Sequence, residues 1–317
     1  MPDIKKILVI RLSSFGDIVL SFPLIKKLKE IFPGSEIHYL TRNNYKEVAE
    51  LNPNLNKIIS FEGSLMNIRR TIKKEHYDLI IDIHKNFRSI VLSFLNAGTV
   101  KRYTKENFKK FMLVKFKLNL FKEVIPVYKK YMLTVSKFIK ESGTEYSNTE
   151  LVFDRERIYK DDYVLVSPSS RHFTKTFPVI KFIAYINTQT NKKFIITGDG
   201  SETDMIICRL IEANCSNVIN LCGKLNINEL ANVIFYSDFV ICNDSAILHL
   251  AEALGKKAVA VFGSTVKEFG FFPQLKQSKV LEIIDLKCRP CTHIGRENCP
   301  EGHFNCMELS FSVLNLR

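Results

Sequence analysis

The 317-residue sequence lacks any apolar run near the ~20 residues that a membrane-spanning helix needs. It also lacks a leader made of a basic stretch, an apolar core and a small-residue cleavage site, and it has no short-period repeat and no low-complexity tract. Its 46% hydrophobic and 25% charged residues are ordinary for a globular protein and exclude wholesale disorder. We therefore expect a soluble cytoplasmic protein with two domains of about 150 residues each.

Two kinds of binding motif are also missing. The first apolar run is followed by SSFGD and not by G-x-G-x-x-G, which disfavours a dinucleotide-dependent oxidoreductase. Neither an RNP1 motif nor a GXXG loop is visible in a suitable context, so RNA binding would rest on charge alone. We expect no nucleic-acid partner.

Acidic residues are scarce in the first half of the chain. Residues 1–150 hold 27 Lys and Arg against 15 Asp and Glu, whereas the remaining residues are nearly balanced. This asymmetry indicates an anionic partner for the first half, such as an anionic membrane face or a phosphorylated substrate. The alternative is a lysine-rich surface that only keeps the protein soluble.

Residues 101–140 concentrate this charge. They contain twelve Lys and Arg but only two acids, Glu106 and Glu123, interleaved with phenylalanines and tyrosines at roughly helical spacing. Such amphipathic helices could lie on an anionic lipid surface. Alternatively, they pack their aromatic side chains on the sheet and point their lysines at water.

The chain is organised around residues 7–23, ILVIRLSSFGDIVLSFP. A β-branched apolar run, a small polar turn and a helically spaced apolar pattern predict a buried strand, a loop and a helix. Ligands of open α/β sheets bind at such loops, at the carboxyl ends of the strands. Asp17 lies at this edge, where it either caps the helix or accepts a proton from a substrate hydroxyl.

Strands and helices alternate along the rest of the chain, which predicts α/β structure with parallel sheets covered on both faces. Residues 142–159 are polar and rich in turn formers, and a second alternation begins after them. We expect two Rossmann-like domains, residues 1–155 and 156–317, facing each other across a cleft. Strands are predicted at residues 7–10, 36–41, 57–61, 78–84, 163–167, 193–197, 218–221, 239–242 and 258–262.

Two loops of the second half could bind a nucleotide. Residues 167–178 carry Ser169 and Lys175, whose hydroxyl and ammonium groups suit a diphosphate, although Lys175 could equally be a solvated loop lysine. In residues 197–204, Gly198 permits close approach of a ligand, and Glu202 could accept hydrogen bonds from a ribose. The alternative for Glu202 is an acid in the first turn of a helix, where it stabilises the helix dipole.

A third loop opens a helix directly after a strand. Asp244 and Ser245 lie at this point, so that backbone N–H groups and the helix dipole form an anion site. His249 follows five residues after Asp244 and is more typical of a packed helix histidine than of a catalyst.

Taken together, these segments resemble glycosyltransferase family 9, the ADP-heptose:lipopolysaccharide heptosyltransferases. The resemblance rests on the ordered set RLSSFGDIVLSFP, YDLIIDIHKNFRS, TKTFP, GDGSETD and NDSAILHLAEALGKKAVAVFGST, and on the late cysteines. It implies a GT-B architecture, in which the N-terminal domain binds the acceptor and the C-terminal domain binds the nucleotide sugar.

The resemblance also implies roles for individual residues. Asp17 matches the general base, and Lys175 matches the lysine on the donor phosphates. The remaining donor-site expectations are Ser169, Gly198, Glu202, Asp244, Ser245 and His249. The acceptor-site expectations are Ser14, Arg88, Lys101 and Arg102.

The chain departs from the family pattern at two positions. Ala246 stands where the family usually has Gly, and Ser264 stands where Pro is usual. An alanine at a position of close approach could displace the diphosphate or force a positive φ. Neither change removes a charged group, so activity remains the expectation.

Four of the eight cysteines cluster late in the chain as C-x2-C-x7-C-x6-C, namely Cys288, Cys291, Cys299 and Cys306. Structural zinc prefers paired short spacings, and only the first pair has one. We expect catalysis without a metal, because a helix N-terminus and a lysine can stabilise the leaving ADP. Structural zinc at the cysteines is the alternative.

The leading hypothesis is an inverting heptosyltransferase that uses ADP-heptose and a phosphorylated lipid A-core acceptor, with peripheral contact to the inner face of the cytoplasmic membrane. The alternatives are a transferase of the same fold that uses another nucleotide sugar, and a non-catalytic protein that binds anionic glycolipid.

Overall fold

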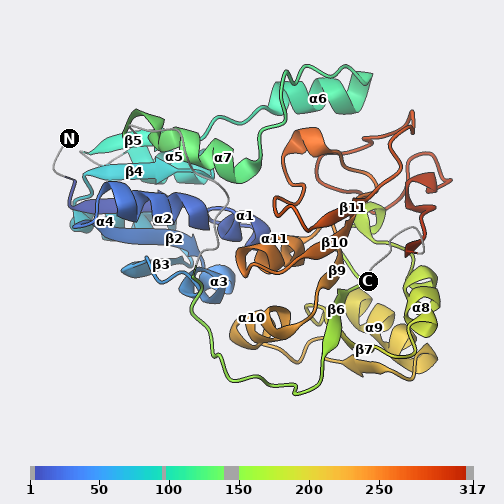
Figure 1. Cartoon of the computed structure of the whole chain (residues 1–317). Helices are drawn as coiled ribbons and strands as arrows, with labels where there is room; N and C mark the ends of the chain where they lie inside the picture. Colours follow the sequence, from blue (N-terminus) through green and yellow to red (C-terminus); the bar gives the residue numbers. More distant parts are fainter. Residues whose placement is uncertain (1–3, 95–97, 139–149, 312–317) are drawn as a thin grey trace. The chain divides into compact units, whose positions relative to one another are not determined.

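The computed structural model describes residues 4–94, 98–138 and 150–311. Contacts divide the chain into two compact units (Figure 1). Unit 1 comprises Met1–Lys105 and Ile125–Val152, and unit 2 comprises Glu106–Val124 and Phe153–Arg317. The segment Glu106–Val124 thus belongs to unit 2. The sequence had instead predicted a single division of the chain near residue 155. None of the helices in the described ranges is long and apolar enough to cross a bilayer.

Unit 1 is built on a five-stranded parallel sheet in the order β3-β2-β1-β4-β5. The central strand is buried along most of its length because its sequence, KILVI, is almost wholly apolar, as befits a strand covered on both faces. Its Val9 lies between Tyr39 and Ile81 in the register of the neighbouring strands. The strands are β1 (Lys6–Ile10), β2 (Glu36–Arg42), β3 (Lys57–Phe61), β4 (Leu79–Asp82) and β5 (Thr99–Arg102).

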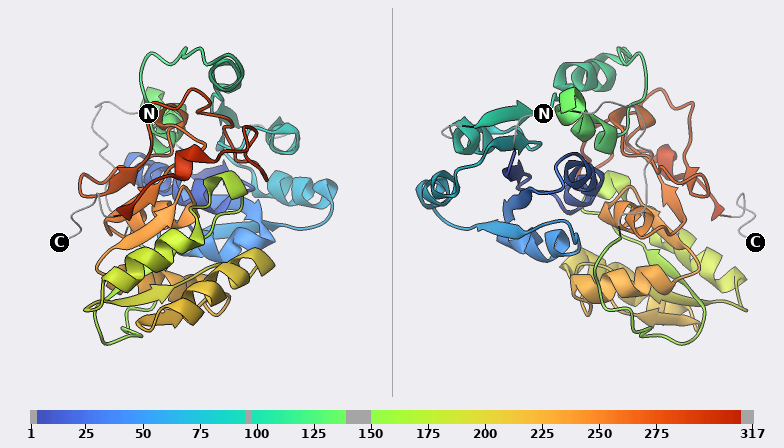
Figure 2. Two further views of the ribbon diagram at one scale, coloured as in Figure 1. Left: turned by 90° about the vertical axis from the view of Figure 1, so that its right-hand side faces the viewer. Right: turned by 60° about the vertical axis from the view of Figure 1, so that its left-hand side comes forward.

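Helices cover both faces of this sheet (Figure 2). The long helix α2 (Phe22–Ile31) packs with α7 (Val127–Met132), and on the other face α4 (Leu65–Glu75) packs with α5 (Phe87–Phe94). The short helices α1 (Phe15–Val19) and α3 (Lys46–Glu50) follow β1 and β2.

The start of the basic stretch was predicted as helix and is a strand. Residues 99–102 form the edge strand β5, in which Lys101 pairs with Ile81 and Arg102 with Asp82. Short edge strands that carry lysine and arginine resist pairing with other chains and show little hydrophobic alternation. This explains why the sequence pattern did not reveal β5.

Unit 2 is built on a six-stranded parallel sheet in the order β11-β10-β9-β6-β7-β8. Its strands are β6 (Tyr163–Ser167), β7 (Lys193–Ile196), β8 (Val218–Asn220), β9 (Val240–Asn243), β10 (Ala258–Val261) and β11 (Lys279–Leu281). Its helices are α6 (Asn107–Phe116), α8 (Val179–Thr188), α9 (Glu202–Asn214), α10 (Ile227–Tyr236) and α11 (Ala246–Ala253). The predicted strands of the second half are all present, and the three-residue strand β11 is additional.

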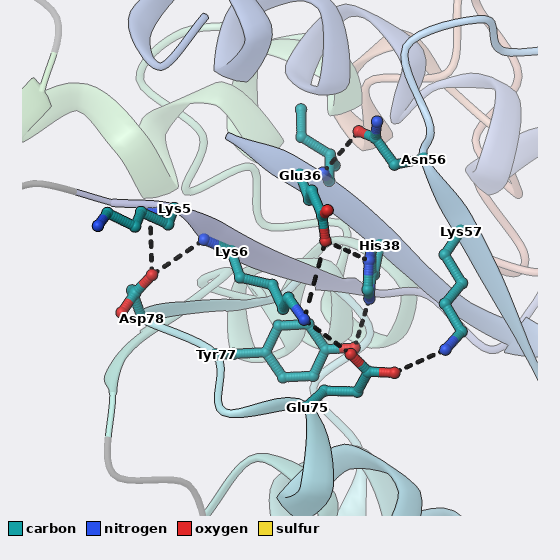
Figure 3. A network of polar contacts seen from close by, with 10 residues as sticks. Lys5, Lys6, Glu36, His38, Asn56, Lys57, Glu75, Tyr77 and Asp78 are labelled. Carbon is teal, nitrogen blue, oxygen red and sulfur yellow. Dashed lines mark hydrogen bonds and ion pairs between the residues drawn. The ribbon is translucent and has the colours of Figure 1, made fainter. Parts of the chain in front are cut away.

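The amino ends of the strands in unit 1 are joined by a network of charged and polar side chains (Figure 3). Glu75 binds the ammonium groups of Lys6 at 2.9 Å and Lys57 at 2.6 Å, and these two hydrogen bonds lower the pKa of Glu75 to about 2. His38 Nδ1 lies 2.9 Å from the Tyr77 hydroxyl. The network is therefore largely satisfied within the protein and fastens β1, β2 and β3 to the segment that enters β4.

Candidate functional site

The candidate base of unit 1, Asp17, lies in the first turn of α1, directly after β1. The Asp17 carboxylate accepts hydrogen bonds from the backbone N–H of Ser14 at 3.4 Å and from the Ser14 hydroxyl at 2.8 Å. Asp17 thus belongs to a capping box, so the capping interpretation of this residue holds in the structure.

Capping is only part of what surrounds Asp17. Asp17 Oδ2 forms an ion pair with Arg11 Nη2 at 2.6 Å, and the Tyr131 hydroxyl donates to Asp17 Oδ1 at 3.0 Å. The Asp17 side chain is largely buried, with 16% exposure. Burial opposes ionisation, but the Arg11 charge and the hydroxyl donors outweigh it and lower the pKa of Asp17. The site therefore presents an ionised, oriented carboxylate.

A histidine that sequence reasoning overlooked lies at the same edge of the sheet. His84 follows β4, and its buried Nδ1 has no hydrogen-bond partner among the described residues. Burial lowers its pKa to about 4, and the neighbouring charges of Arg11, Lys105 and Arg42 add to this effect. His84 is thus neutral at physiological pH and lies among cationic groups, an arrangement that suits an anionic ligand.

The loop that presents His84 is shaped by Asp82, which is fully buried. Asp82 accepts hydrogen bonds from the backbone N–H groups of His84 and Lys85 and from the Ser89 hydroxyl, at 2.7–3.0 Å. Asp82 therefore has a structural role, because it holds the backbone of the loop that carries His84.

The four expected acceptor residues have different surroundings. Ser14 contacts Asp17, and Arg88 is exposed on α5. Lys101 lies over the Phe138 ring, and Arg102 donates to Ser93 at 2.8 Å. Among these four, Ser14 is the residue that the structure brings into contact with the candidate base.

In unit 2, the candidate phosphate lysine and the aspartate of the third loop form one cluster. Lys175 Nζ lies 2.7 Å from Asp244 Oδ2, which also accepts a 2.6 Å hydrogen bond from the Thr265 hydroxyl. Lys175 is thus mostly buried and paired, which is unlike a solvated loop lysine. Because a carboxylate would repel a diphosphate, the geometry favours Asp244 as the residue that positions Lys175.

Two buried hydroxyl groups lie beside this cluster without a partner. Ser245 is the N-cap residue of α11, and Ser264 follows β10; neither Oγ atom has a hydrogen-bond partner among the described residues. Unpaired buried hydroxyls are costly, so a ligand that accepts their hydrogen bonds would be favoured. Together with the N-terminus of α11 and Lys175, they form a site suited to an anion.

The family departure at Ala246 causes no backbone strain. Ala246 is the first residue of α11 and is absent from the described residues with positive φ. Of the two consequences that the sequence left open for Ala246, the positive φ does not occur, because the helix begins there in the ordinary right-handed region.

The glycine loop after β7 is shaped by internal packing. A Cβ atom on Gly198 would lie 2.6 Å from Asp204 Oδ2. The group that closely approaches this glycine is therefore the Asp204 side chain and not a ligand. Asp204 Oδ2 accepts a hydrogen bond from Asp199 N at 2.8 Å, whereas Glu202 is exposed in the first turn of α9. Glu202 therefore remains available to a ligand, and Gly198 contributes to the shape of the loop.

His249 is a packed helix residue, as its position suggested. It is buried, and its ring centroid lies 6.0 Å from that of Phe271. On the same helix, sequence reasoning missed Glu252, whose buried carboxylate accepts hydrogen bonds from the backbone N–H groups of Gln274 and Leu275. Both residues fix the fold around the site.

Comparisons with known proteins identify the family of this chain. The sequence model of glycosyltransferase family 9 (heptosyltransferase) matches residues 65–301. Lipooligosaccharide heptosyltransferase 2 of Haemophilus ducreyi is 24% identical over 311 residues, which cover 88% of this chain and 89% of the relative.

Two solved structures show the same fold. E. coli heptosyltransferase WaaC with ADP has a TM-score of 0.71 and 16% identity, and the match covers 87% of this chain and 92% of that chain. E. coli ADP-heptose lps heptosyltransferase II has a TM-score of 0.72 and 15% identity, with coverage of 96% and 97%. Two parallel sheets flanked by helices, as in these GT-B neighbours, confirm the predicted fold class.

The Arg11–Asp17 pair yields a pH-dependent prediction. In Arg11→Met, the Asp17 carboxylate loses its counter-charge in a largely buried position, which we expect to cost about 3 kcal/mol of unfolding free energy at neutral pH. In the wild type, the lowered pKa of Asp17 stabilises the fold above the ordinary carboxyl pKa of about 3.9, and this contribution is lost as the pH falls. The deficit of the variant should therefore shrink at low pH, as measured by urea unfolding.

Arg69→Met, on the surface of α4, is the matched control and should unfold like the wild type. The double variant Arg11→Met/Asp17→Asn should recover part of the stability. An equal deficit at neutral pH and well below the ordinary carboxyl pKa of about 3.9 would show that the pair is not the cause.

Proposed function

Because the chain belongs to glycosyltransferase family 9, the heptosyltransferase family, we propose that it transfers heptose from ADP-heptose to the inner core of a lipopolysaccharide precursor. The observation that carries this proposal is the cluster of Lys175, Ser245 and Ser264 at the N-terminus of α11. The names of its relatives and neighbours support the choice of substrates, because they specify heptosyltransferases, ADP and ADP-heptose.

The donor diphosphate would bind in unit 2. The two unpartnered hydroxyls donate hydrogen bonds to phosphate oxygens, and the dipole of α11 favours their negative charge. Lys175 keeps its ion pair with Asp244, contacts the phosphates through its other N–H groups, and stabilises the ADP anion that leaves in the reaction. The exposed carboxylate of Glu202 is the acceptor that we assign to a ribose hydroxyl.

The acceptor hydroxyl would be activated in unit 1. Its oxygen attacks the anomeric carbon from the face opposite the diphosphate, the bond from that carbon to the phosphate oxygen breaks, and ADP leaves. The hydroxyl proton passes to Asp17, and the configuration inverts. A carboxylate with a lowered pKa can still accept this proton, because the acceptor hydroxyl becomes strongly acidic as its oxygen bonds to the anomeric carbon.

The cationic surroundings of Asp17 fit a phosphorylated acceptor. Arg42 ends β2, Lys105 follows β5, and His84 lies between their strands at the carboxyl edge. Charged groups from separate strands can contact several anionic groups of one ligand at once. We therefore add Arg42, His84 and Lys105 to Ser14 as acceptor-binding residues.

Contact with the membrane is proposed for α6. Phe108, Phe111 and Phe116 on this helix are 67%, 54% and 60% exposed, and lysines lie between them. Exposed aromatics beside cations favour the boundary of an anionic bilayer. In the same basic stretch, Tyr128 and Tyr131 are buried in unit 1, so the packing interpretation holds for α7.

Replacing the proposed base separates chemistry from binding. Asp17→Asn should lower kcat by about two to four orders of magnitude, because the amide cannot accept the proton, while ADP-heptose affinity stays unchanged. Transfer to a lipid A-core acceptor and calorimetric binding of ADP-heptose are the measurements. Glu62→Gln, an exposed carboxylate of the same unit, is the control. Undiminished transfer by Asp17→Asn would remove the base assignment.

Replacing the donor lysine tests the nucleotide site. Lys175→Ala should weaken ADP binding by ~10- to 100-fold, the value of a charge-assisted contact with phosphate. Calorimetry with ADP, UDP and GDP measures both affinity and base preference. Lys193→Ala, at the amino end of β7, should leave ADP binding intact. A wild type that binds none of these nucleotides would favour the non-catalytic, glycolipid-binding alternative.

The membrane assignment is tested with vesicles. Phe108→Ser/Phe111→Ser should reduce co-sedimentation with vesicles rich in anionic phospholipid by about tenfold, since each buried aromatic ring contributes apolar area. Ile284→Ser, an isolated exposed residue of unit 2, serves as the control. Equal sedimentation of all three proteins would place the contact elsewhere.

A further inference from the structure

The segment that follows β11 is long and irregular. Residues 282–304 contain no helix or strand, and then comes the short 3-10 turn Asn305–Met307. Two of its apolar side chains, Ile284 and Ile294, are 77% and 56% exposed. A segment of this length without regular structure usually needs a specific constraint to order it, because it has few apolar groups to bury.

Four cysteines of this region surround one small cavity. Cys288, Cys291, Cys299 and Cys306 all line it, and the other lining residues include Thr174, Ser264, Arg289 and His303. Its volume of about 10 Å³ matches the space for a single water-sized occupant. Four thiols gathered from an irregular segment around a space for one atom suggest a ligand set.

The other cysteines of the chain have different surroundings. Cys208, Cys222 and Cys242 lie in or beside the helices and strands of unit 2 and are buried in its interior, where reduced thiols act as small apolar groups. Cys288, Cys291 and Cys299 are only half-buried. Apolar packing therefore explains the first set better than the second.

We propose that Cys288, Cys291, Cys299 and Cys306 bind one thiolate-preferring metal ion, zinc or ferrous iron, in a tetrahedral structural site. Four thiolates are the ligand set for which these ions are selected, and the C-x2-C pair supplies the usual short arm. The longer spacings to Cys299 and Cys306 lie within one irregular segment, which can bring its thiols together without disrupting a helix or strand.

The thiols must move to enclose the ion. As the side chains stand, no group of three or more Cys, His, Asp or Glu in the described ranges is arranged to hold a metal. Enclosing an ion would therefore require rotation of these side chains about χ1, as in metal sites that close only when the ion binds.

The site would brace the proposed donor loops. Arg289, between the first two cysteines, donates from Nε and Nη2 to the Thr265 carbonyl at 3.0 and 2.6 Å. The Thr265 hydroxyl in turn binds Asp244, the partner of Lys175. The backbone of Arg296, between the second and third cysteines, binds Thr174 through its N–H group at 2.9 Å and its carbonyl at 3.1 Å.

The cysteine segment also contacts Glu106–Val124, the segment that contains α6. Lys117 Nζ donates to the carbonyls of Cys288 at 2.9 Å and Pro290 at 2.6 Å. A metal ion that fixes the cysteine segment therefore fixes the carbonyls that receive Lys117, in addition to the donor loops.

Metal analysis of the full-length protein tests the site directly. Protein purified under reducing conditions should contain about one equivalent of zinc or iron by inductively coupled plasma mass spectrometry, which also identifies the ion. The variants Cys288→Ser and Cys299→Ser should each contain less than about a tenth of the wild-type metal content. Cys215→Ser, outside the cluster, should retain the wild-type content.

A second measurement covers variants that fail to fold. Cobalt added to chelator-treated wild-type protein should produce the intense charge-transfer absorption of a thiolate-bound ion, and zinc should abolish it. Wild-type protein that fails to develop this absorption with cobalt would overturn the proposal. Equal metal content in Cys288→Ser, Cys299→Ser and Cys215→Ser would do the same.

The bracing role rests on the proposed donor site, and it is tested by ADP binding and thermal unfolding before and after metal removal. Removal of the metal should weaken ADP binding and lower the melting temperature together. Unchanged ADP affinity after metal removal would refute the bracing role. Absence of ADP binding in the metal-loaded protein would instead refute the proposed donor site. The metal content is measured independently of the donor site and of the bracing role.

Discussion

The polar chemistry of this protein is confined to strand ends because both of its sheets are parallel and buried on both faces. Strands such as β1 and β10 are almost wholly apolar, so charged groups within the sheets would be expensive. Each unit carries a buried ion pair at the carboxyl edge, Arg11–Asp17 in one and Lys175–Asp244 in the other. A pair is required there, since a lone buried charge would destabilise the fold.

The two edges of the unit 1 sheet differ in how fully their polar groups are satisfied. At the amino edge, Glu75 bridges two lysines and His38 pairs with Tyr77. At the carboxyl edge, His84 Nδ1 has no partner among the described residues. Unit 2 shows the same feature at its carboxyl edge, in the hydroxyls of Ser245 and Ser264. Buried polar atoms without a partner also occur away from the strand ends, for example the Tyr185 hydroxyl on α8, so unmet hydrogen-bonding capacity indicates a ligand-binding edge only together with the charges gathered there.

The sequence was sufficient to predict the α/β class and the positions of the longer strands, because buried parallel strands give continuous apolar runs. It also singled out Asp17 and Lys175, which lie in short ordered motifs and whose catalytic and donor-binding roles stay predictions. It could not reveal Tyr131 as a partner of Asp17, since 114 residues separate them and only the packing of α7 brings them together. The edge strand β5 and the three-residue β11 were missed because neither carries enough alternation to register as a strand.

The two departures from the family pattern change the donor edge in ways that can now be separated. Ala246 lies within the first turn of α11, so its methyl group adds bulk near the helix N-terminus without straining the backbone. Ser264 is buried and places an unpartnered hydroxyl at the end of β10, where a proline side chain could donate nothing. Ala246 thus adds a methyl group at the donor edge, and Ser264 adds a hydrogen-bond donor. A hydrogen bond from Ser264 to a phosphate oxygen would compensate for a more distant approach at Ala246, so the same edge can still bind a diphosphate in a shifted position.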